Sequence, residues 1–422
     1  MKPISISLTP NTEKDDIRLA LGLILQPWKW KKGRAIGDFE NQLRGYLGVR
    51  FAVSFNSGRS ALMAILRSFN LPADSEVLLQ SFTCVAAVSP IIWEGLKPIY
   101  VDCDKESFNM DLVDLRAKIS PRTRVLMVQH TFGLPCDMEA VLGIAKQSNL
   151  IVIEDCAHAL DASYNGQKVG TFGKASFFSF SRDKIISSVY GGMAVTDDEE
   201  IGRRLKELQK DFGYPSFFWI FQQLLHPLLM NFVILPVYNF LDLGKIFLVL
   251  SQWFGILSKA VHWKEKIGKR PSYFPERLPY ALAALAQNQF KKLDRFYNHR
   301  REIVDLYFKE LQNTAFELPK EFPGRKNSFL RFTIKHPKAH EIIYEAWHKQ
   351  NILVGDWYMK PVVPIDTDLE SIGYKIGCCP NAEKLAKITL NLPTHINISV
   401  QDARKIINFL KEYEHHNKRD RK

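Results

Sequence analysis

The chain has 422 residues, of which 46% are hydrophobic and 24% are charged, a balance that is ordinary for a folded protein and argues against extensive disorder. Its formal net charge is +12 at pH 7, but no helix-turn-helix, zinc or RNP signature accompanies the basic residues, which disfavours a nucleic-acid partner. The charge also suits phosphorylated small molecules or an anionic membrane surface. The six cysteines show no C-x-x-C pair and no metal-like spacing with histidine, and the stretch 1–12 lacks the apolar core of a signal peptide. These features predict a cytoplasmic protein without a metal site.

From residue 49 onward, short apolar runs alternate with helical patterns. Several runs are apolar on both faces, as strands buried between two layers of helices are. The alternation predicts an α/β fold with a mostly parallel sheet. The strand-like runs are 49–55, 76–80, 98–102, 124–130, 150–155, 175–180 and 192–196, and helical patterns between them include 60–69, 111–119 and 137–148. A long amphipathic pattern, 280–311, then leads into a C-terminal part that mixes strand and helix signals.

A glycine-bearing turn, Asn56 to Ser60, lies between the first strand-like run and the helical pattern that follows it. A turn at a helix N-terminus exposes backbone N–H groups, which suit a phosphate. Taken alone, a turn of this kind more often serves only as an N-cap.

Asp155 and His158 follow the strand-like run 150–155. Ligands of open α/β sheets bind beyond the carboxyl ends of the strands, so an acid is well placed there. A carboxylate beside a pyridine nitrogen keeps the ring protonated and makes it a better electron sink. The alternatives are a helix N-cap for Asp155 and, for His158, a partly buried histidine with a backbone partner.

Ser179, Ser181 and Lys184 follow the next strand-like run and precede the pair Gly191 and Gly192. A lysine amine forms a Schiff base with an aldehyde once burial or a cationic neighbour lowers its pKa. The serine hydroxyls suit a phosphate. One lysine in a basic chain is most often a solvated side chain. The order of a phosphate turn, an acid at a strand end and then this lysine is what a fold-type-I pyridoxal-phosphate enzyme needs.

Further short motifs run along nearly the whole chain. They are Phe39-Glu40, Leu47-Gly48, Ser57-Gly58-Arg59-Ser60-Ala61-Leu62, Pro98-Ile99-Tyr100-Val101-Asp102, Gly133 with Asp137, Glu154-Asp155-Cys156-Ala157-His158, Gly166, Gly170 and Gly173, Ser179-Phe180 with Lys184, Gly191-Gly192 and Leu392-Pro393-Thr394-His395. With these motifs the sequence resembles the DegT/StrS family of sugar aminotransferases, everywhere except over 212–270. Each motif is short, but their combination is specific.

The resemblance implies a fold-type-I architecture similar to that of aspartate aminotransferase. A large domain with a mostly parallel seven-stranded sheet would span 1–300, and a smaller α+β domain would span 301–422. The enzyme would use pyridoxal 5'-phosphate to transfer an amino group, usually from glutamate, to a keto-sugar on a nucleotide or lipid carrier. Amino-sugar and cell-surface polysaccharide biosynthesis need such reactions. The family is typically a homodimer with its active sites at the subunit interface.

The family's site residues carry over to individual positions of this chain. Lys184 would be the Schiff-base lysine and proton shuttle, Asp155 would pair with the pyridine nitrogen, and His158 would lie close to the ring. Backbone groups of Arg59 and Ser60, with the Ser179 hydroxyl, would hold the phosphate. The cofactor-binding set is Gly58, Arg59, Ser60, Cys84, Asp155, His158, Ser179 and Lys184.

Three positions depart from the family pattern. Cys84 stands where an aromatic residue usually stacks on the cofactor, and Arg59 stands where threonine is usual, adding a cation at the phosphate or a contact to an acidic substrate. Pro275-Glu276-Arg277 aligns with a motif that supplies an asparagine and an arginine across the dimer, and the asparagine is missing. These departures keep open a non-catalytic regulatory or scaffold protein. A pyridoxal-phosphate-dependent sugar dehydratase is the other alternative, but those relatives replace the lysine by histidine, whereas Lys184 is present.

Residues 212–270 interrupt the α/β pattern and form an apolar insertion. The run 217–241 contains no Asp, Glu, Lys or Arg, and a second apolar run covers 246–257. Pro227 and Pro236 argue against a single transmembrane helix. We expect a broken hairpin of apolar helices that touches the inner face of a membrane through 217–257, where a lipid-linked sugar would be presented. The alternative is an insert buried in the dimer interface or over the active site.

Overall fold

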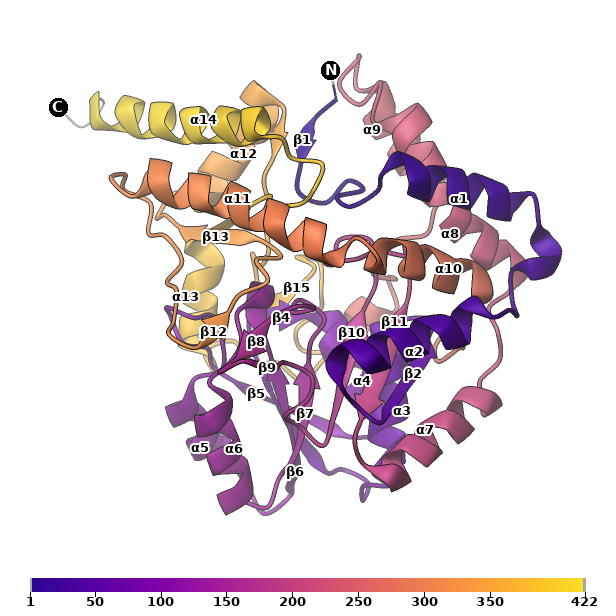
Figure 1. Cartoon of the computed structure of the whole chain (residues 1–422). Helices are drawn as coiled ribbons and strands as arrows, with labels where there is room; N and C mark the ends of the chain where they lie inside the picture. Colours follow the sequence, from indigo (N-terminus) through magenta and orange to yellow (C-terminus); the bar gives the residue numbers. More distant parts are fainter. Residues whose placement is uncertain (1, 420–422) are drawn as a thin grey trace.

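A seven-stranded sheet forms the centre of the molecule (Figure 1). The structure is a computed structural model that describes residues 2–419, with side chains as far as residue 415. The strands are β2 (Phe51–Phe55), β3 (Glu76–Gln80), β5 (Lys97–Val101), β6 (Thr123–Gln129), β7 (Ile151–Asp155), β10 (Ala175–Ser179) and β11 (Gly192–Thr196). They lie in the order β2-β11-β10-β7-β6-β3-β5, and all neighbours are parallel except that β11 runs antiparallel to β2 and β10. The predicted α/β class and mostly parallel sheet are confirmed.

Helices cover both faces of the sheet (Figure 1). Those of the large unit are α1 (Lys14–Ile24), α2 (Ala35–Leu47), α3 (Gly58–Ser68), α4 (Val85–Trp93), α5 (Leu112–Lys118), α6 (Met138–Gln147), α7 (Glu199–Asp211) and α10 (Tyr280–Phe290). Successive residues of a strand point to opposite faces. On β3, Val77 and Leu79 join an apolar cluster with α3 and α4, whereas Leu78 joins another cluster with α5 and α6. This double burial explains why the strand sequences are apolar throughout rather than alternating.

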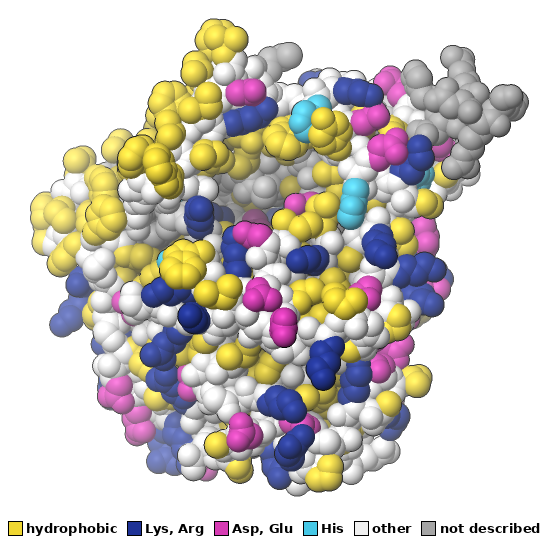
Figure 2. All heavy atoms as spheres, turned by 180° about the vertical axis from the view of Figure 1, so that it is seen from behind, with side chains coloured by type: hydrophobic (Ala, Val, Ile, Leu, Met, Phe, Trp, Pro, Cys, Tyr) yellow, Lys and Arg dark blue, Asp and Glu magenta, His cyan; other side chains and the backbone are white. Residues whose placement is uncertain are grey.

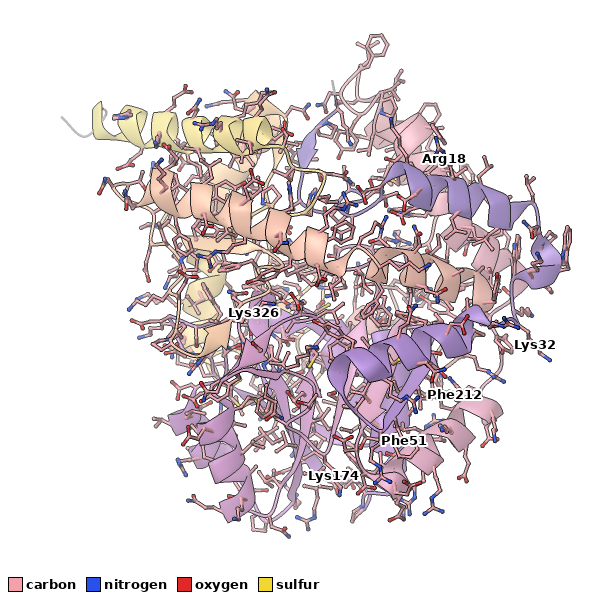
Figure 3. The ribbon with its side chains drawn as sticks, in the orientation of Figure 1. Arg18, Lys32, Phe51, Lys174, Phe212 and Lys326 are labelled. Atoms are coloured by element: carbon pink, nitrogen blue, oxygen red, sulfur yellow. The ribbon has the colours of Figure 1, made fainter. Side chains whose placement is uncertain are left out.

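Helix α7 packs beside β2 and leads into the insertion (Figure 3). Gly202 of α7 leaves room for the ring of Phe51, because a Cβ at this glycine would lie 2.3 Å from that ring. Just beyond the helix, the ring centroid of Phe212 lies 5.9 Å from that of Phe55 on β2. These aromatic contacts fix the point from which the insertion departs.

A second, smaller unit follows the large one and has its own apolar core. Its elements are α11 (Leu293–Leu311), α12 (Ala339–Gln350), α13 (Pro380–Ile388), α14 (Val400–Arg419), β13 (Phe332–Lys335) and β16 (Thr389–Leu392). β13 and β16 pair antiparallel, with Phe332 opposite Leu392. This is the predicted α+β arrangement. The predicted domain boundary at residue 300 falls inside α11 and stays a prediction.

Short strands connect the two units. They are β1 (Ile4–Ser5) with β14 (Ile352–Leu353), β4 (Thr83–Cys84) with β15 (Val362–Val363), and β8 (Ser163–Tyr164) with β9 (Gln167–Lys168) and β12 (Arg325–Lys326). The β4–β15 pair sets Thr83 opposite Val362 and Cys84 opposite Val363. It thereby brings the C-terminal segment that contains Trp357 and Tyr358 to the carboxyl ends of the central strands.

The insertion is helical and broken, as predicted. It consists of α8 (Phe217–Leu229), a π-helical turn η3 (Met230–Ile234) and α9 (Leu243–Trp253). By length and composition alone, Phe217–Ile234 is apolar enough to cross a membrane, but half of this stretch is buried against the rest of the protein. A core helix of a soluble protein passes the same test, so this finding does not define a span.

Candidate active site

A cavity lies at the carboxyl ends of β7 and β10, next to the first turn of α3. Every residue of the predicted cofactor-binding set lines it, with the exception of Ser60. Three separate sequence motifs therefore converge on one site, because parallel strands end at the same edge of the sheet.

The turn before α3 forms one wall of the cavity. Ser57 is the N-cap of this helix, and its Oγ accepts the N–H of Ser60 at 3.1 Å. The Ser60 hydroxyl donates to Asn56 Oδ1 at 2.6 Å, so Ser60 is turned into the protein instead of toward the cavity. The N-cap already uses the N–H of Ser60, and the expected role of this residue at the phosphate stays a prediction. Helix geometry leaves the N–H groups of Gly58 and Arg59 without intrahelical acceptors.

Two glycines let this turn approach its neighbours closely. A Cβ on Gly58 would lie 3.1 Å from Cβ of Ser179, and a Cβ on Gly192 would lie 2.3 Å from N of Gly58. The helix start, the Ser179 hydroxyl and β11 are consequently packed against each other. Free N–H groups and a hydroxyl at a helix N-terminus match the donors that a phosphate requires.

Asp155 ends β7 and is buried. Its Oδ1 accepts the N–H of Ala157 at 2.9 Å. Burial raises the pKa of this carboxyl, while the Ala157 hydrogen bond and the charge of Lys184 act in the opposite direction. A cation placed against this carboxyl would offset the cost of burying its charge. A protonated pyridine nitrogen is such a cation, so Asp155 fits the predicted cofactor.

Lys184 lies at the centre of the lining, and burial lowers the pKa of its amine, against the opposing charges of Asp183, Cys84 and Asp155. Within the part of the chain that the structure describes, this amine has no hydrogen bond and no ion pair. Its Nζ lies 5.1 Å from the ring centroid of Trp357. A buried amine with a lowered pKa and no polar partner among the described residues suits condensation with an aldehyde.

The backbone of this lysine, in contrast, is firmly held. The side-chain amide of Asn11 donates to the carbonyl oxygens of Lys184 and Ile185. The guanidinium of Arg300, which is fully buried in α11, donates to Asn11 Oδ1 at 3.0 Å. Asn11 is thus a positioning residue that the sequence gave no reason to choose.

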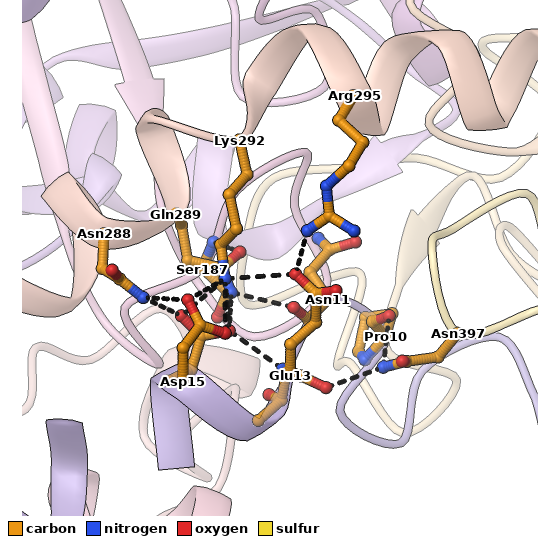
Figure 4. A network of polar contacts seen from close by, with 12 residues as sticks. Pro10, Asn11, Glu13, Asp15, Ser187, Asn288, Gln289, Lys292, Arg295 and Asn397 are labelled. Atoms are coloured by element: carbon orange, nitrogen blue, oxygen red, sulfur yellow. Dashed lines mark hydrogen bonds and ion pairs between the residues drawn. The ribbon is translucent and has the colours of Figure 1, made fainter. Parts of the chain in front are cut away.

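The segment around Asn11 is anchored by an acidic cluster on α1 (Figure 4). Lys292 Nζ lies 2.9 Å from Asp15 Oδ2 and 3.0 Å from Asp16 Oδ2. Gln289 donates to the backbone oxygen of Asn11 at 2.8 Å. This network joins the N-terminal segment to the junction of α10 and α11, and therefore supports the lysine loop.

His158 lies within a group of aromatic rings. Its ring stacks on Phe132 and Trp357 at centroid distances of 6.1 and 5.6 Å. Nδ1 accepts the N–H of Phe132 at 3.3 Å, and Nε2 lies 3.5 Å from the hydroxyl of Tyr358. Burial lowers the pKa of the imidazole well below its ordinary value, so the ring is neutral. His158 thus lines the cavity and also has a backbone hydrogen-bond partner, as expected if it were only a buried histidine.

Cys84 lines the cavity from the start of α4. Burial raises the pKa of its thiol, with the Ala86 N–H and the charges of Arg59 and Lys184 opposing, so the side chain is a neutral, polarisable wall.

The cation expected at position 59 is already paired. Arg59 Nε lies 3.0 Å from Oε2 of Glu265, a fully buried residue at the end of the insertion, and its Nη2 donates to the Ala260 oxygen at 2.7 Å. The guanidinium is thus neutralised by a residue that sequence reasoning did not single out. The motif Pro275-Glu276-Arg277 lies outside the cavity lining. The side-chain amide of Asn56 donates to Oε2 of its Glu276 at 3.1 Å within the same chain.

Further lining or adjacent groups come from the smaller unit. Arg331 Nη2 lies 3.2 Å from Asp183 Oδ2, and its guanidinium stacks 3.5 Å above the ring centroid of Trp357. These residues were missed because only tertiary contacts place them beside Lys184. The adjacent aromatic residues Trp357 and Tyr358 were the one available signal, and the structure buries Tyr358.

Comparison with known proteins agrees with this geometry. A sequence model of the DegT/DnrJ/EryC1/StrS aminotransferase family matches residues 11–217 and 252–411. The chain belongs to this family. The unmatched stretch, 218–251, is the central part of the apolar insertion, which is therefore an addition to the common core.

Curated relatives cover nearly the full length. A dTDP-3-amino-3,6-dideoxy-alpha-D-galactopyranose transaminase of Aneurinibacillus thermoaerophilus is 36% identical over 94% of this chain and 95% of its own. A GDP-perosamine synthase of Escherichia coli O157:H7 is 28% identical over 92% of both chains. Among solved structures, the Helicobacter pylori aminotransferase PseC has a TM-score of 0.75 with 23% identity, over 98% of this chain and 100% of that one, and shows the shared fold.

These findings make the chain a pyridoxal-phosphate-dependent sugar aminotransferase of fold type I.

Proposed function

We propose that the enzyme transfers an amino group from glutamate to a keto-sugar on a nucleotide or lipid carrier, in amino-sugar or cell-surface polysaccharide biosynthesis. The relatives named above act on nucleotide-linked sugars by their names, and a further relative is the spore coat polysaccharide biosynthesis protein SpsC of Bacillus subtilis, 26% identical over 96% of this chain and 95% of its own. The observation that carries the proposal is the unpaired amine of Lys184, which lines one cavity together with Asp155 and the phosphate turn.

Each chemical role has a group of suitable character. When bound, pyridoxal phosphate supplies an aldehyde for a primary amine and a ring that delocalises an electron pair. The N–H groups of Gly58 and Arg59, with the Ser179 hydroxyl, hold the phosphate. Asp155 holds the ring nitrogen in its protonated form. Lys184 provides the amine that binds the aldehyde.

The proton transfer also falls to Lys184. With its lowered pKa, this amine would move a proton between the substrate carbon and the cofactor carbon on the other side of the shared nitrogen, which is a 1,3-shift. His158 remains uncharged and, with Phe132 and Trp357, forms an aromatic wall that excludes water.

We further propose that the enzyme is a cytoplasmic homodimer with peripheral membrane contact through 217–257. The family resemblance supports the dimer, and the apolar insertion supports the membrane contact.

Isotopically labelled glutamate, offered with a panel of nucleotide-linked and lipid-linked keto-sugars, tests the reaction. Nitrogen label should appear in a sugar, and glutamate alone should bleach the visible absorbance of the holoenzyme. A colourless protein that glutamate leaves unchanged would favour the regulatory or scaffold alternative instead.

A further inference from the structure

The insertion lines a second cavity that opens beside the first one. Both cavities share Cys84, Asp183 and Trp357 in their linings, so a molecule in the second cavity reaches the wall of the catalytic one. The insertion contributes Met230 and Leu248 to this second lining, from η3 and α9. The family model leaves 218–251 unmatched, a stretch that contains η3 and most of α9.

The second cavity has a cationic part and an apolar part. Arg182, Lys259 and Lys266 line it, together with the carboxylates of Asp183 and Asp356, and Lys266 is paired with Asp366. Within the described residues, Arg182 has no ion pair, and its buried Nε has no hydrogen-bond acceptor, although Nη2 donates to Ser258. A guanidinium held in place without a carboxylate partner suits a phosphate or diphosphate. Met230 and Leu248 supply the apolar part, which suits hydrocarbon.

The polar residues of the insertion face inward. Gln222 donates to the Gly255 oxygen, Gln223 Oε1 accepts the Ser258 hydroxyl at 2.8 Å, and His226 is buried. Hydrogen bonds within the protein therefore satisfy the two glutamine side chains. The insertion thus buries these polar groups together with apolar residues such as Ile220 and Leu224, while further apolar residues remain on its outer side.

The outward side is broadly apolar. Figure 2 shows hydrophobic side chains crowded along the edge where α8 and α9 lie, beside a hollow in the surface. Exposed residues there include Phe240, Leu241, Phe247, Val249, Trp253 and Phe254, with Leu241 79% and Trp253 76% exposed. Isolated apolar residues on a surface are ordinary, whereas a contiguous group of this kind marks an interaction site.

The charges around the apolar face favour an anionic membrane as the surface that covers it. Between Phe217 and Lys264 the only acid is Asp242, and Lys245 neutralises it at 2.7 Å. Lys259 and Lys264 follow the apolar face, and Trp263 lies exposed between them. Apolar helices bordered by tryptophan and lysine are the pattern of proteins that lie in the interface of an anionic bilayer.

We propose that the insertion docks on an anionic membrane and that the second cavity receives the diphosphate and first isoprenoid units of a polyprenyl-linked sugar. The attached keto-sugar then passes Cys84 and Trp357 to reach Lys184. This inference rests on the proposed aminotransferase function and selects the lipid carrier over the nucleotide.

Vesicle flotation tests the docking surface. The holoenzyme should float with vesicles of equal parts phosphatidylglycerol and phosphatidylcholine, and more weakly with phosphatidylcholine alone. The double variant Trp253→Ser/Phe254→Ser should lose flotation. Val113→Ser, which alters an 80% exposed apolar residue on α5, should float as the parent does.

Calorimetry with farnesyl diphosphate tests the cavity. Farnesyl diphosphate should bind the holoenzyme at least about tenfold more tightly than inorganic diphosphate, because burial of two methylene-sized groups already supplies that factor. Leu248→Asp should remove this preference and leave flotation unchanged. Trp253→Ser/Phe254→Ser should keep the preference for farnesyl diphosphate and lose flotation.

The outcomes separate the two proposals. A normal visible spectrum and normal bleaching by glutamate, without flotation and without preference for farnesyl diphosphate, would overturn the lipid inference and leave the aminotransferase standing. A soluble dimer that dissociates in the Trp253→Ser/Phe254→Ser variant would assign the apolar face to a second copy instead. A holoenzyme that glutamate cannot bleach would count against the proposed function itself.

Discussion

Arg59 Nε lies 3.0 Å from Glu265 Oε2, an ion pair between the first turn of α3 and the far end of the insertion. The glutamate is fully buried and the arginine side chain is 11% exposed. The pair therefore couples the turn that we propose to hold the phosphate to the insertion that carries the apolar face.

Removing one partner of this pair should be costly. Glu265→Ala should lower the free energy of unfolding by about 3–5 kcal/mol, because it leaves a buried guanidinium without a counter-charge. Arg50→Ala, which breaks the exposed pair with Glu199, should cost under about 1 kcal/mol. Denaturant unfolding of the two variants would measure both values, and equal losses would show that the Arg59 pair is solvated.

Gly192→Ala should disturb the phosphate turn. The new Cβ would lie 2.3 Å from N of Gly58, so the turn must shift, at a cost of about 1–3 kcal/mol. The dissociation constant of pyridoxal phosphate, measured by fluorescence titration, should rise. Gly22→Ala on α1 is the control, since nothing lies within 4 Å of its added Cβ and its helix should gain roughly 0.5–1 kcal/mol. Unchanged cofactor affinity in Gly192→Ala would place the phosphate elsewhere.

Asp155→Asn should retain the cofactor but lose activity. Without the carboxylate the pyridine nitrogen is no longer held protonated, and the rate should fall roughly 10²-fold, the size expected when one electrostatic stabiliser is removed. The rate of bleaching by glutamate is the measurement. Asp211→Asn, at the exposed end of α7, should react at the parent rate. If Asp155→Asn also reacts at the parent rate, the Asp155 carboxyl has no role in the reaction.

The pH dependence of cofactor capture should follow the lowered pKa of Lys184. Only the neutral amine reacts, so the rate at which cofactor-free protein captures pyridoxal phosphate should rise with pH. It should level off below the ordinary lysine value of about 10.4, because the folded-state pKa is depressed. Asp183→Asn should shift the plateau to still lower pH, since the negative charge of Asp183 favours the ammonium. A shift toward higher pH would contradict this electrostatic account.

The sheet and the central site residues were predictable for the same reason. Strands that are buried on both faces have continuous apolar sequences, and polar residues directly after them must lie at the sheet edge. This reasoning identified Asp155 from the end of β7 and Lys184 from the loop after β10. Two strands, Glu76–Gln80 and Gly192–Thr196, have the predicted bounds.

Other features of the site and of the insertion depend on tertiary contacts that no local sequence pattern indicates. Trp357 lies in a segment that the β4–β15 pair holds at the site, and these strands are only two residues long and have no periodicity to detect. Arg331 comes from the residue before β13. The sequence also did not indicate that Ser60 turns away from the cavity, where its N–H donates to Ser57 and its hydroxyl donates to Asn56. The insertion was recognisable as apolar helices, but the side that faces outward is set by packing against the rest of the chain.

The most direct test of the central claim is to locate the cofactor chemically. The holoenzyme would be reduced with borohydride and digested, and the pyridoxyl-modified peptide would be identified by mass spectrometry. We predict that the modification lies on Lys184, and that Lys184→Ala folds but has neither the modification nor the visible absorbance. A pyridoxyl group on another lysine, or none at all in a protein saturated with pyridoxal phosphate, would contradict the account.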